Sequence, residues 1–147
     1  MFQHLSENSR VWVYQSDRVL KDEEILFLNS ELKAFVAQWA AHGNQLFGDH
    51  LVYQKRFIIL CVDESQSNAS GCSIDSSVRV IKELGKELSV DFFSRMNVYL
   101  EKDDEFKYVH ISEVKNFGEW NIYNPMITNL KELRDKWLIP VSNSPFV

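Results

Sequence analysis

The sequence lacks any long hydrophobic run. Its longest uninterrupted apolar stretch is Phe57 to Val62, whereas a helix that crosses a membrane needs about 20 such residues. The first residues, Met1 to Ser6, contain neither the basic region nor the apolar core of a secretory signal. We therefore expect a chain without a membrane span, located in the cytoplasm.

Cysteine and histidine are also scarce, with two and four residues in the whole chain. Cys61 and Cys72 do not form a C-x-x-C motif, and the histidines are scattered without the spacing of metal ligands. These absences argue against a disulfide framework, a zinc site and a thioredoxin-type motif. The sequence predicts a reduced protein without a metal or another cofactor.

Positive charge is not concentrated anywhere along the chain. The formal net charge is −5, neither half of the chain is basic, and the largest Lys/Arg cluster is the pair Lys55-Arg56. Binding to a nucleic acid duplex requires several contacts between basic side chains and phosphates. Nucleic acid is therefore not an expected partner.

The chain does contain enough apolar residues for one hydrophobic core. A length of 147 residues, with 45% of them hydrophobic, suits a single globular domain over residues 1–147. A domain of this size buries about 70% of the surface of its unfolded chain, so it folds without disulfides or metals. Intrinsic disorder is excluded because the apolar share is too high and the charge too low.

Hydrophobic periodicity predicts both strands and helices, since a period of two indicates a strand and a period near 3.6 a helix. The predicted strands are 11–14, 51–62 with a bend near 54–56, the hairpin arms 96–101 and 106–111, and an edge strand at 120–123. Four helical segments are predicted. The first starts at 22 and ends at a Gly43 cap, and the second covers 73–88. The third is a single turn at 112–117, and the fourth starts after a Thr128 cap and stops at Pro140. Residues 138–147 are expected to form a C-terminal strap. The predicted fold is α+β, a single domain with a mixed central sheet and about three helices packed on it.

The strand–loop–helix segment over 57–79 carries the only candidate chemistry. The central strand leads through Asp63 into a loop of small residues, where the second helix begins. Ligands tend to bind at the carboxyl ends of strands in open α/β sheets, and helix N-termini attract anions. Gly71 would allow close approach of a ligand, and Ser70 and Ser73 would donate hydroxyl hydrogen bonds. A structural interpretation, in which Ser73 caps the helix and Gly71 forms the turn, is favoured on residue chemistry alone.

Charged residues around this loop extend the candidate site. Arg56, next to the central strand, is expected to need a ligand or a carboxylate, which Asp63, Glu64 or Asp75 would supply. Asp75 and Arg79, four residues apart on a helix, form an exposed ion pair or contact the same ligand. The candidate ligand-binding residues are Arg56, Ser70, Gly71, Ser73, Asp75 and Arg79.

A catalytic interpretation of the same loop depends on Cys72. A thiol at a helix N-terminus has a lowered pKa and is a stronger nucleophile, and His42 or Asp63 would serve as its base. Asp63 and Glu64 also suit acid–base catalysis or magnesium binding. The alternative is a small, half-buried cysteine near a turn, because nothing in the sequence joins Cys72 to a base. Arg79 follows Cys72 by seven residues, one more than in phosphatase-type loops.

Five distinctive passages, spread over nearly the whole chain, carry a family resemblance. They are Ala40–Gly43, Arg56–Leu60, Val62–Gln66, Trp137–Pro140 and, most specific of all, Ala69–Arg79. Together they resemble a family of uncharacterised small bacterial proteins often labelled "ABC transporter ATPase". The resemblance implies no established activity.

The ATPase label itself has no support in the sequence. A phosphate-binding loop has the form G-x-x-x-x-G-K-[S/T], and the only Gly-Lys pair here is Gly85-Lys86. Val80 occupies the place of the first glycine, and Glu87 follows the lysine.

Two classes of function remain. The first is a non-enzymatic cytosolic protein that binds a protein partner or a small anionic ligand at the 70–75 loop. The second is a small hydrolase or transferase that acts on an anionic substrate through the same loop. We rank binding first, because active sites usually leave more recognisable residue combinations in a sequence.

Overall fold

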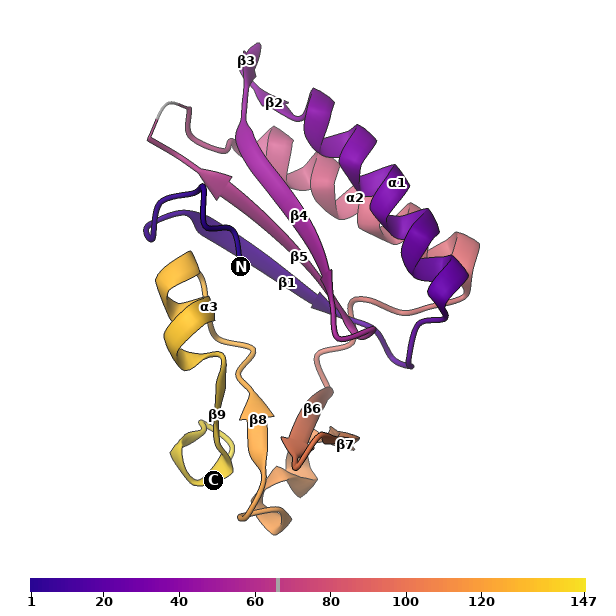
Figure 1. Ribbon diagram of the computed structural model, residues 1–147, viewed down its shortest axis with the longest axis vertical. Helices are drawn as coiled ribbons and strands as arrows, with labels where there is room; N and C mark the ends of the chain where they lie inside the picture. The colour runs from indigo at the N-terminus through magenta and orange to yellow at the C-terminus, as the bar shows by residue number, and fades with distance from the viewer. Residues whose placement is uncertain (66) are drawn as a thin grey trace.

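Three α-helices and a set of antiparallel strands make up the part of the chain that the structure describes, residues 1–65 and 67–147 of a computed structural model (Figure 1). The strands are Arg10–Gln15 (β1), Ala40–Ala41 (β2), Asn44–Gln45 (β3), Phe47–Tyr53 (β4), Phe57–Asp63 (β5), Asn97–Lys102 (β6), Glu105–His110 (β7), Asn121–Tyr123 (β8) and Leu138–Pro140 (β9). The α-helices are Asp22–Gln38 (α1), Gly71–Leu88 (α2) and Leu130–Lys136 (α3), and short 3₁₀ helices cover Ile111–Asn116 (η1) and Val141–Asn143 (η2). The predicted α+β class is confirmed.

β5 is the central strand of the first sheet, whose order is β1-β5-β4. Both neighbours run antiparallel to β5, so β1 and β4 are parallel to each other and are connected through α1 in a split β-α-β arrangement. Every residue of β5 is buried, as the continuous apolar run predicted. Successive side chains point to opposite faces of the sheet, so β5 contributes to two separate cores.

One face of this sheet is covered by α1 and α2, which lie side by side in Figure 1. Ile58 and Leu60 of β5 pack there against Leu28 and Leu32, which lie four residues apart on α1. Trp39, just beyond α1, is buried in the same core and its indole Nε1 donates a 2.9 Å hydrogen bond to the Ser73 carbonyl of α2. No helix within the described residues is both long and apolar enough to cross a bilayer.

The opposite face of the sheet packs against α3 and the second sheet, whose order is β7-β6-β8-β9. Phe57 of β5 is fully enclosed there, with its ring centroid 5.4 Å from Tyr99, 4.8 Å from Tyr123 and 4.8 Å from Trp137. These three aromatic side chains come from β6, β8 and the C-terminal end of α3. Phe57 therefore joins the first sheet to the whole C-terminal part of the chain.

Two hairpins replace features predicted as a helix end and a strand bend. α1 ends at Gln38, and Gly43 lies in the turn between β2 and β3 rather than at a helix cap. The bend near Gln54 is a reversal of direction between β4 and β5. The central residues of both turns have positive φ (51° at His42, 79° at Gly43, 54° at Gln54 and 56° at Lys55), the pattern of tight hairpin turns. Three of these four residues are not glycine, so the sequence carried little turn signal.

The strands form separate antiparallel sheets rather than one mixed sheet. The predicted hairpin of β6 and β7 and the helical turn at η1 are confirmed. β8, predicted as an edge strand, lies between β6 and β9. The helix predicted to start with a Thr128 cap is capped by Asn129, whose side chain accepts a 2.8 Å hydrogen bond from the Glu132 amide. In the tail expected to be a strap, residues 138–140 form β9 and pair with β8.

The ends of α1 and α2 are connected through a partly buried ion pair. The Arg18 guanidinium makes 2.8 Å and 2.7 Å hydrogen bonds to the two carboxylate oxygens of Glu24, and Nη2 also donates to the Leu88 carbonyl at the end of α2. The Arg18 side chain lowers the pKa of Glu24 to about 2. Because Glu24 is more acidic in the folded chain, its contribution to stability is present above its unfolded pKa of about 4.3 and is lost as the pH falls toward 2.

We expect Glu24→Gln to lower the free energy of unfolding at pH 7 by about 1 kcal/mol or less, as for other partly exposed ion pairs. The difference from the unmodified chain should shrink steadily between about pH 4.5 and pH 2, where the carboxylate becomes protonated in both states. Urea unfolding, followed by circular dichroism at several pH values, measures the free energy of unfolding of both chains. Glu23→Gln removes a charge from the same turn of α1 at an exposed residue that makes no ion pair among the described residues; it is the control and should lower stability by less than about 0.5 kcal/mol. A constant Glu24→Gln difference down to pH 2 would contradict this assignment.

Candidate functional site

The two carboxylates at the C-terminal end of β5, those of Asp63 and Glu64, hold the following loop through hydrogen bonds. Asp63 is buried, and its two oxygens accept hydrogen bonds from the amides of Ser65 (3.0 Å) and Ser6 (3.1 Å). These contacts, with the Ser65 amide foremost, hold the pKa of Asp63 below its ordinary value. Glu64 accepts a 2.7 Å hydrogen bond from the Ala69 amide. A carboxylate engaged in this way is a poor base and does not suit the catalytic role predicted for Asp63.

The serines predicted to bind an anion instead cap α2. The Ser70 hydroxyl accepts a 3.1 Å hydrogen bond from the Ser73 amide, and the Ser73 hydroxyl accepts a 2.7 Å bond from the Ser70 amide. This reciprocal pair satisfies two of the amides at the helix start. Around Gly71, a Cβ atom would meet no described atom within 4 Å, so no other described segment of the chain packs against this glycine. The structural interpretation of Ser70, Gly71 and Ser73 is the one that these contacts favour.

Cys72 and His42, the candidate nucleophile and base, are both exposed. His42 lies in the turn of the β2–β3 hairpin, which Figure 1 places beside the N-terminal end of α2. Within the described residues, no hydrogen bond joins the thiol of Cys72 to His42 or to any other side chain. The geometry of an activated thiol, with a base in hydrogen-bond contact, is thus not formed among these residues.

Arg56 lies far from the carboxylates that were expected to pair with it. Seven steps of about 3.3 Å along an extended strand separate Arg56 from Asp63 by roughly 23 Å, so the two residues are at opposite ends of β5. The guanidinium carbon instead lies 3.8 Å from the centroid of the Phe106 ring, and Nη1 donates a 2.9 Å hydrogen bond to the Gln54 carbonyl. The predicted cluster of Arg56 with Asp63, Glu64 or Asp75 does not form.

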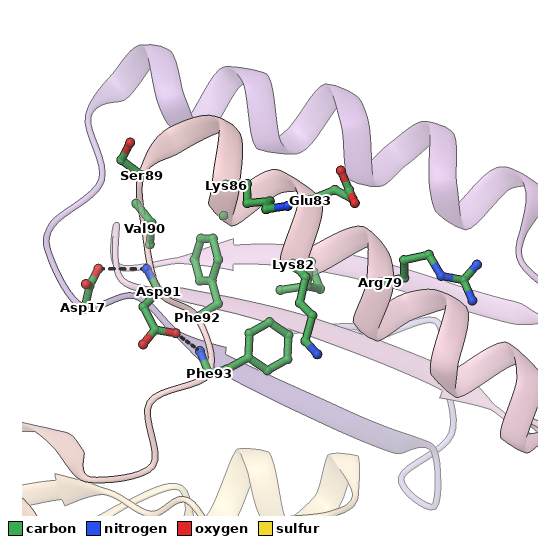
Figure 2. A pocket seen from close by; sticks show the side chains of 12 residues that line it. Asp17, Arg79, Lys82, Glu83, Lys86, Ser89, Val90, Asp91, Phe92 and Phe93 are labelled. Carbon is green, nitrogen blue, oxygen red and sulfur yellow. Dashed lines mark hydrogen bonds between the residues drawn. The ribbon is translucent and has the colours of Figure 1, made fainter.

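Arg79 is one of the residues that line a groove along the C-terminal half of α2, seen from close by in Figure 2. The ion pair predicted between Arg79 and Asp75 is absent from the salt bridges of the described residues, in which no charged atoms of these two side chains come within 4.0 Å. Of the six predicted ligand-binding residues, Arg79 is the one that lines this groove.

The groove, here called the α2 groove, has a volume of about 640 Å³. Its lining comes from α2 between Arg79 and Lys86, from residues 89–93 after the helix, and from Asp17. Apolar side chains of this lining are Ile81, Val90, Phe92 and Phe93. A volume of this size falls within the range of about 300–1,000 Å³ that holds small organic ligands.

Three basic side chains of α2 border the α2 groove. Arg79, Lys82 and Lys86 are separated by three and four residues, the spacing that places side chains on one helix face. Among the described residues, none of the three takes part in an ion pair or a side-chain hydrogen bond. The Lys82 ammonium lies 5.6 Å from the centroid of the Phe93 ring, within the range of a cation–π contact.

Unlike the three basic side chains, two acidic side chains of the α2 groove, those of Asp17 and Asp91, accept hydrogen bonds from backbone amides. Asp17 accepts a 3.2 Å hydrogen bond from the Asp91 amide, and Asp91 accepts a 2.8 Å bond from the Phe93 amide, as the dashed lines of Figure 2 mark. Both carboxylates therefore fix the loop after α2, while Glu83 points away from Lys82 and Arg79 in the same view. In Figure 2, Asp17 and Asp91 lie at the end of the groove that is farther from Arg79.

Gly85 allows this groove to form. A Cβ atom at this position would lie 2.6 Å from the Val90 carbonyl oxygen and 3.3 Å from the Phe92 ring. The Val90 amide donates a 2.9 Å hydrogen bond to the Gly85 carbonyl, and Ser89 adopts a left-handed conformation with φ of 56°. The chain therefore folds back directly onto the helix at a residue that has no side chain.

Sequence reasoning missed Lys82, Lys86 and the aromatic pair Phe92-Phe93. The spacing of the three basic residues on a predicted helix was visible in the sequence, and it would have indicated a basic face. Nothing in the sequence indicated that residues 89–93 pack against that helix face. Within the described residues, no group of three or more His, Cys, Asp or Glu side chains is arranged to hold a metal ion.

No protein-family model, characterised protein or solved structure matches this chain.

Proposed function

We propose that the protein is a binding protein for a small anionic ligand with an apolar or aromatic body, held in the α2 groove. The single observation that supports this function is the set of Arg79, Lys82 and Lys86, unpaired within the described residues, around a groove in which the Lys82 ammonium lies 5.6 Å from the centroid of the Phe93 ring. A row of unpaired cations on a chain with a net charge of −5 is a local exception. Cationic groups beside a concave apolar surface favour a ligand with one charged and one apolar part.

The chemistry of each part of the groove defines the ligand. A carboxylate or phosphate group would accept hydrogen bonds from Arg79 and Lys82, which are charge-assisted and about twice as strong as neutral ones. The apolar body would lie over the partly exposed Phe93 ring and cover its accessible surface. This differs from the site first predicted, since the 70–75 loop uses its hydroxyl groups for capping α2. The proposal still names a small anionic ligand and still favours binding over catalysis, as the sequence analysis did.

We expect 1-naphthyl phosphate to bind in the α2 groove and to shift amide resonances of residues 79–93 in a ¹H–¹⁵N correlation spectrum. Inorganic phosphate lacks the apolar body and 1-naphthol lacks the charge, so each should bind at least about tenfold more weakly. The double variant Arg79→Gln/Lys82→Gln should weaken naphthyl phosphate binding about tenfold or more, and added salt should weaken it further. Isothermal titration calorimetry measures the affinities.

The matched control is Lys33→Gln/Lys115→Gln, which removes two exposed positive charges from α1 and η1. Its affinity for naphthyl phosphate should stay within about twofold of the unmodified chain. Equal weakening in both double variants would mean that only net charge matters. That result, resonance shifts confined to residues 70–75, or no binding at millimolar ligand would each overturn the proposed function.

A further inference from the structure

A second cavity lies on the other side of the first sheet, where the β4–β5 hairpin meets α3 and the second sheet. Its volume is about 220 Å³, below the range of roughly 300–1,000 Å³ typical of drug-sized ligands. Its lining comes from five separate parts of the chain: Met1, Tyr53 with Gln54 at the end of β4, Glu101 of β6, Tyr123 of β8, and residues of α3 and the segment after it, among them Trp137. We call this cavity the junction pocket; its size suits a ligand smaller than a drug-sized molecule.

Aromatic rings form the rigid wall of the junction pocket. The Trp137 ring centroid lies 5.3 Å from that of Tyr53 and 4.8 Å from that of Tyr123. Trp137 and Tyr123 are buried, and Leu133 of α3 completes the apolar side. Packed aromatic rings of this kind offer apolar contact area and electron-rich faces that attract cations.

A carboxylate with spare acceptor capacity opens onto the same pocket. The Glu101 oxygen Oε2 accepts one long hydrogen bond of 3.3 Å from the Tyr123 hydroxyl. Within the described residues, Glu101 has no ion pair and Oε1 accepts no hydrogen bond. Burial, and then the nearby Glu101 carboxylate, raise the pKa of Tyr123, so its hydroxyl stays a proton donor to Glu101. An ammonium group would supply the missing donors to this carboxylate.

A guanidinium group lines the pocket as well. Arg134 donates from Nε and Nη2 to the Met1 carbonyl, at 3.3 Å and 2.9 Å, and from Nη2 to the Phe2 carbonyl at 3.0 Å. These bonds orient the group without neutralising its charge. Its Nη1 donates no hydrogen bond within the described residues and makes no ion pair there. It is therefore available to a ligand carboxylate.

We infer that the junction pocket binds a small zwitterion, an α-amino acid with an apolar side chain. The ammonium group would contact Glu101, the carboxylate would contact Arg134, and the side chain would lie against Leu133, Tyr53 and Trp137. Both charges of the ligand must be present together, which excludes amino acids inside a peptide chain. This site is separate from the α2 groove, so the inference does not rest on the proposed function.

The test compares L-leucine with two analogues that each lack one charge, 3-methylbutylamine and 4-methylpentanoate. Binding is measured by titration of a ¹H–¹⁵N correlation spectrum at millimolar ligand. We expect leucine to shift resonances around Tyr53, Glu101 and Trp137 and to bind about tenfold or more tightly than either analogue. Glu101→Gln should remove binding of the amine and leave the acid unaffected, and Arg134→Gln should do the reverse.

Matched controls are Glu113→Gln and Arg95→Gln, which change the same charges at exposed positions away from the junction pocket. Both should bind leucine as the unmodified chain does, as should Arg79→Gln/Lys82→Gln, so failure of this site is distinguishable from failure of the α2 groove. Should Arg134→Gln unfold, Arg134→Lys keeps the charge, and the two analogues test the unmodified chain directly. The inference is overturned if leucine binds no more tightly than its analogues, or equally well to Glu101→Gln.

Discussion

Phe57→Ala should lower the free energy of unfolding by about 3–5 kcal/mol, as for other large aromatic residues removed from a well-packed core. The side chain is 1% exposed and its ring contacts those of Tyr99, Tyr123 and Trp137. Those three belong to β6, β8 and the end of α3, so the cavity would open between the first sheet and the C-terminal part of the chain. The neighbouring rings are themselves fixed by mutual contacts and cannot collapse into the space.

Urea unfolding gives the free energy, and thermal unfolding should show a midpoint about 6–20 °C lower for a chain of this size. The control is Phe47→Ala, the same chemical change on β4 at a side chain that is 51% exposed. It should change stability by no more than about 0.5 kcal/mol. Similar losses in the two variants would contradict the central position of Phe57.

Gly85→Ala should destabilise the protein by about 1–3 kcal/mol, although alanine is the better helix former by about 1 kcal/mol. The added Cβ would lie 2.6 Å from the Val90 carbonyl oxygen, which is backbone and is fixed by the Val90–Gly85 hydrogen bond. Residues 89–93 would have to move away from α2. The same displacement would widen the α2 groove, so resonances of Phe92 and Phe93 should shift as well.

Gly71→Ala is the matched control, because it is the same substitution on the same helix. A Cβ at Gly71 would meet no described atom within 4 Å. The gain in helix propensity therefore stands alone, and stability should stay equal or rise by up to about 1 kcal/mol. Urea unfolding of both variants measures the difference, and equal effects of the two substitutions would contradict the close contact at Gly85.

Much of the fold followed from local patterns. The run Phe57 to Val62 predicted a strand buried on both faces, and the polar residues between β6 and β7 predicted their hairpin. The hairpin turns at His42 and Gln54 were missed because their positive φ values occur at residues that rarely mark such turns. The predicted first helix was too long for a different reason. The apolar pattern continues through Trp39, although α1 ends at Gln38.

The candidate site was predicted less well than the fold. A serine cap of α2 was predicted at Ser73, but the N-cap is Ser70, and Ser73 is the third helical residue that completes the capping box. Arg56 was assigned carboxylate partners that an extended β5 places at its far end. Both cavities depend on segments distant in sequence: the loop after α2 folding back at Gly85, and Tyr53, Glu101 and Trp137 meeting around one space.

By itself, the sequence determined the α+β class and the two-sided burial of β5, because both depend on the period of neighbouring residues. It also determined what the chain lacks: long apolar runs and metal-ligand spacing. Only the tertiary structure decided which charges remain unpaired and where the cavities lie. Those properties depend on which distant side chains meet, and no local periodicity carries that information.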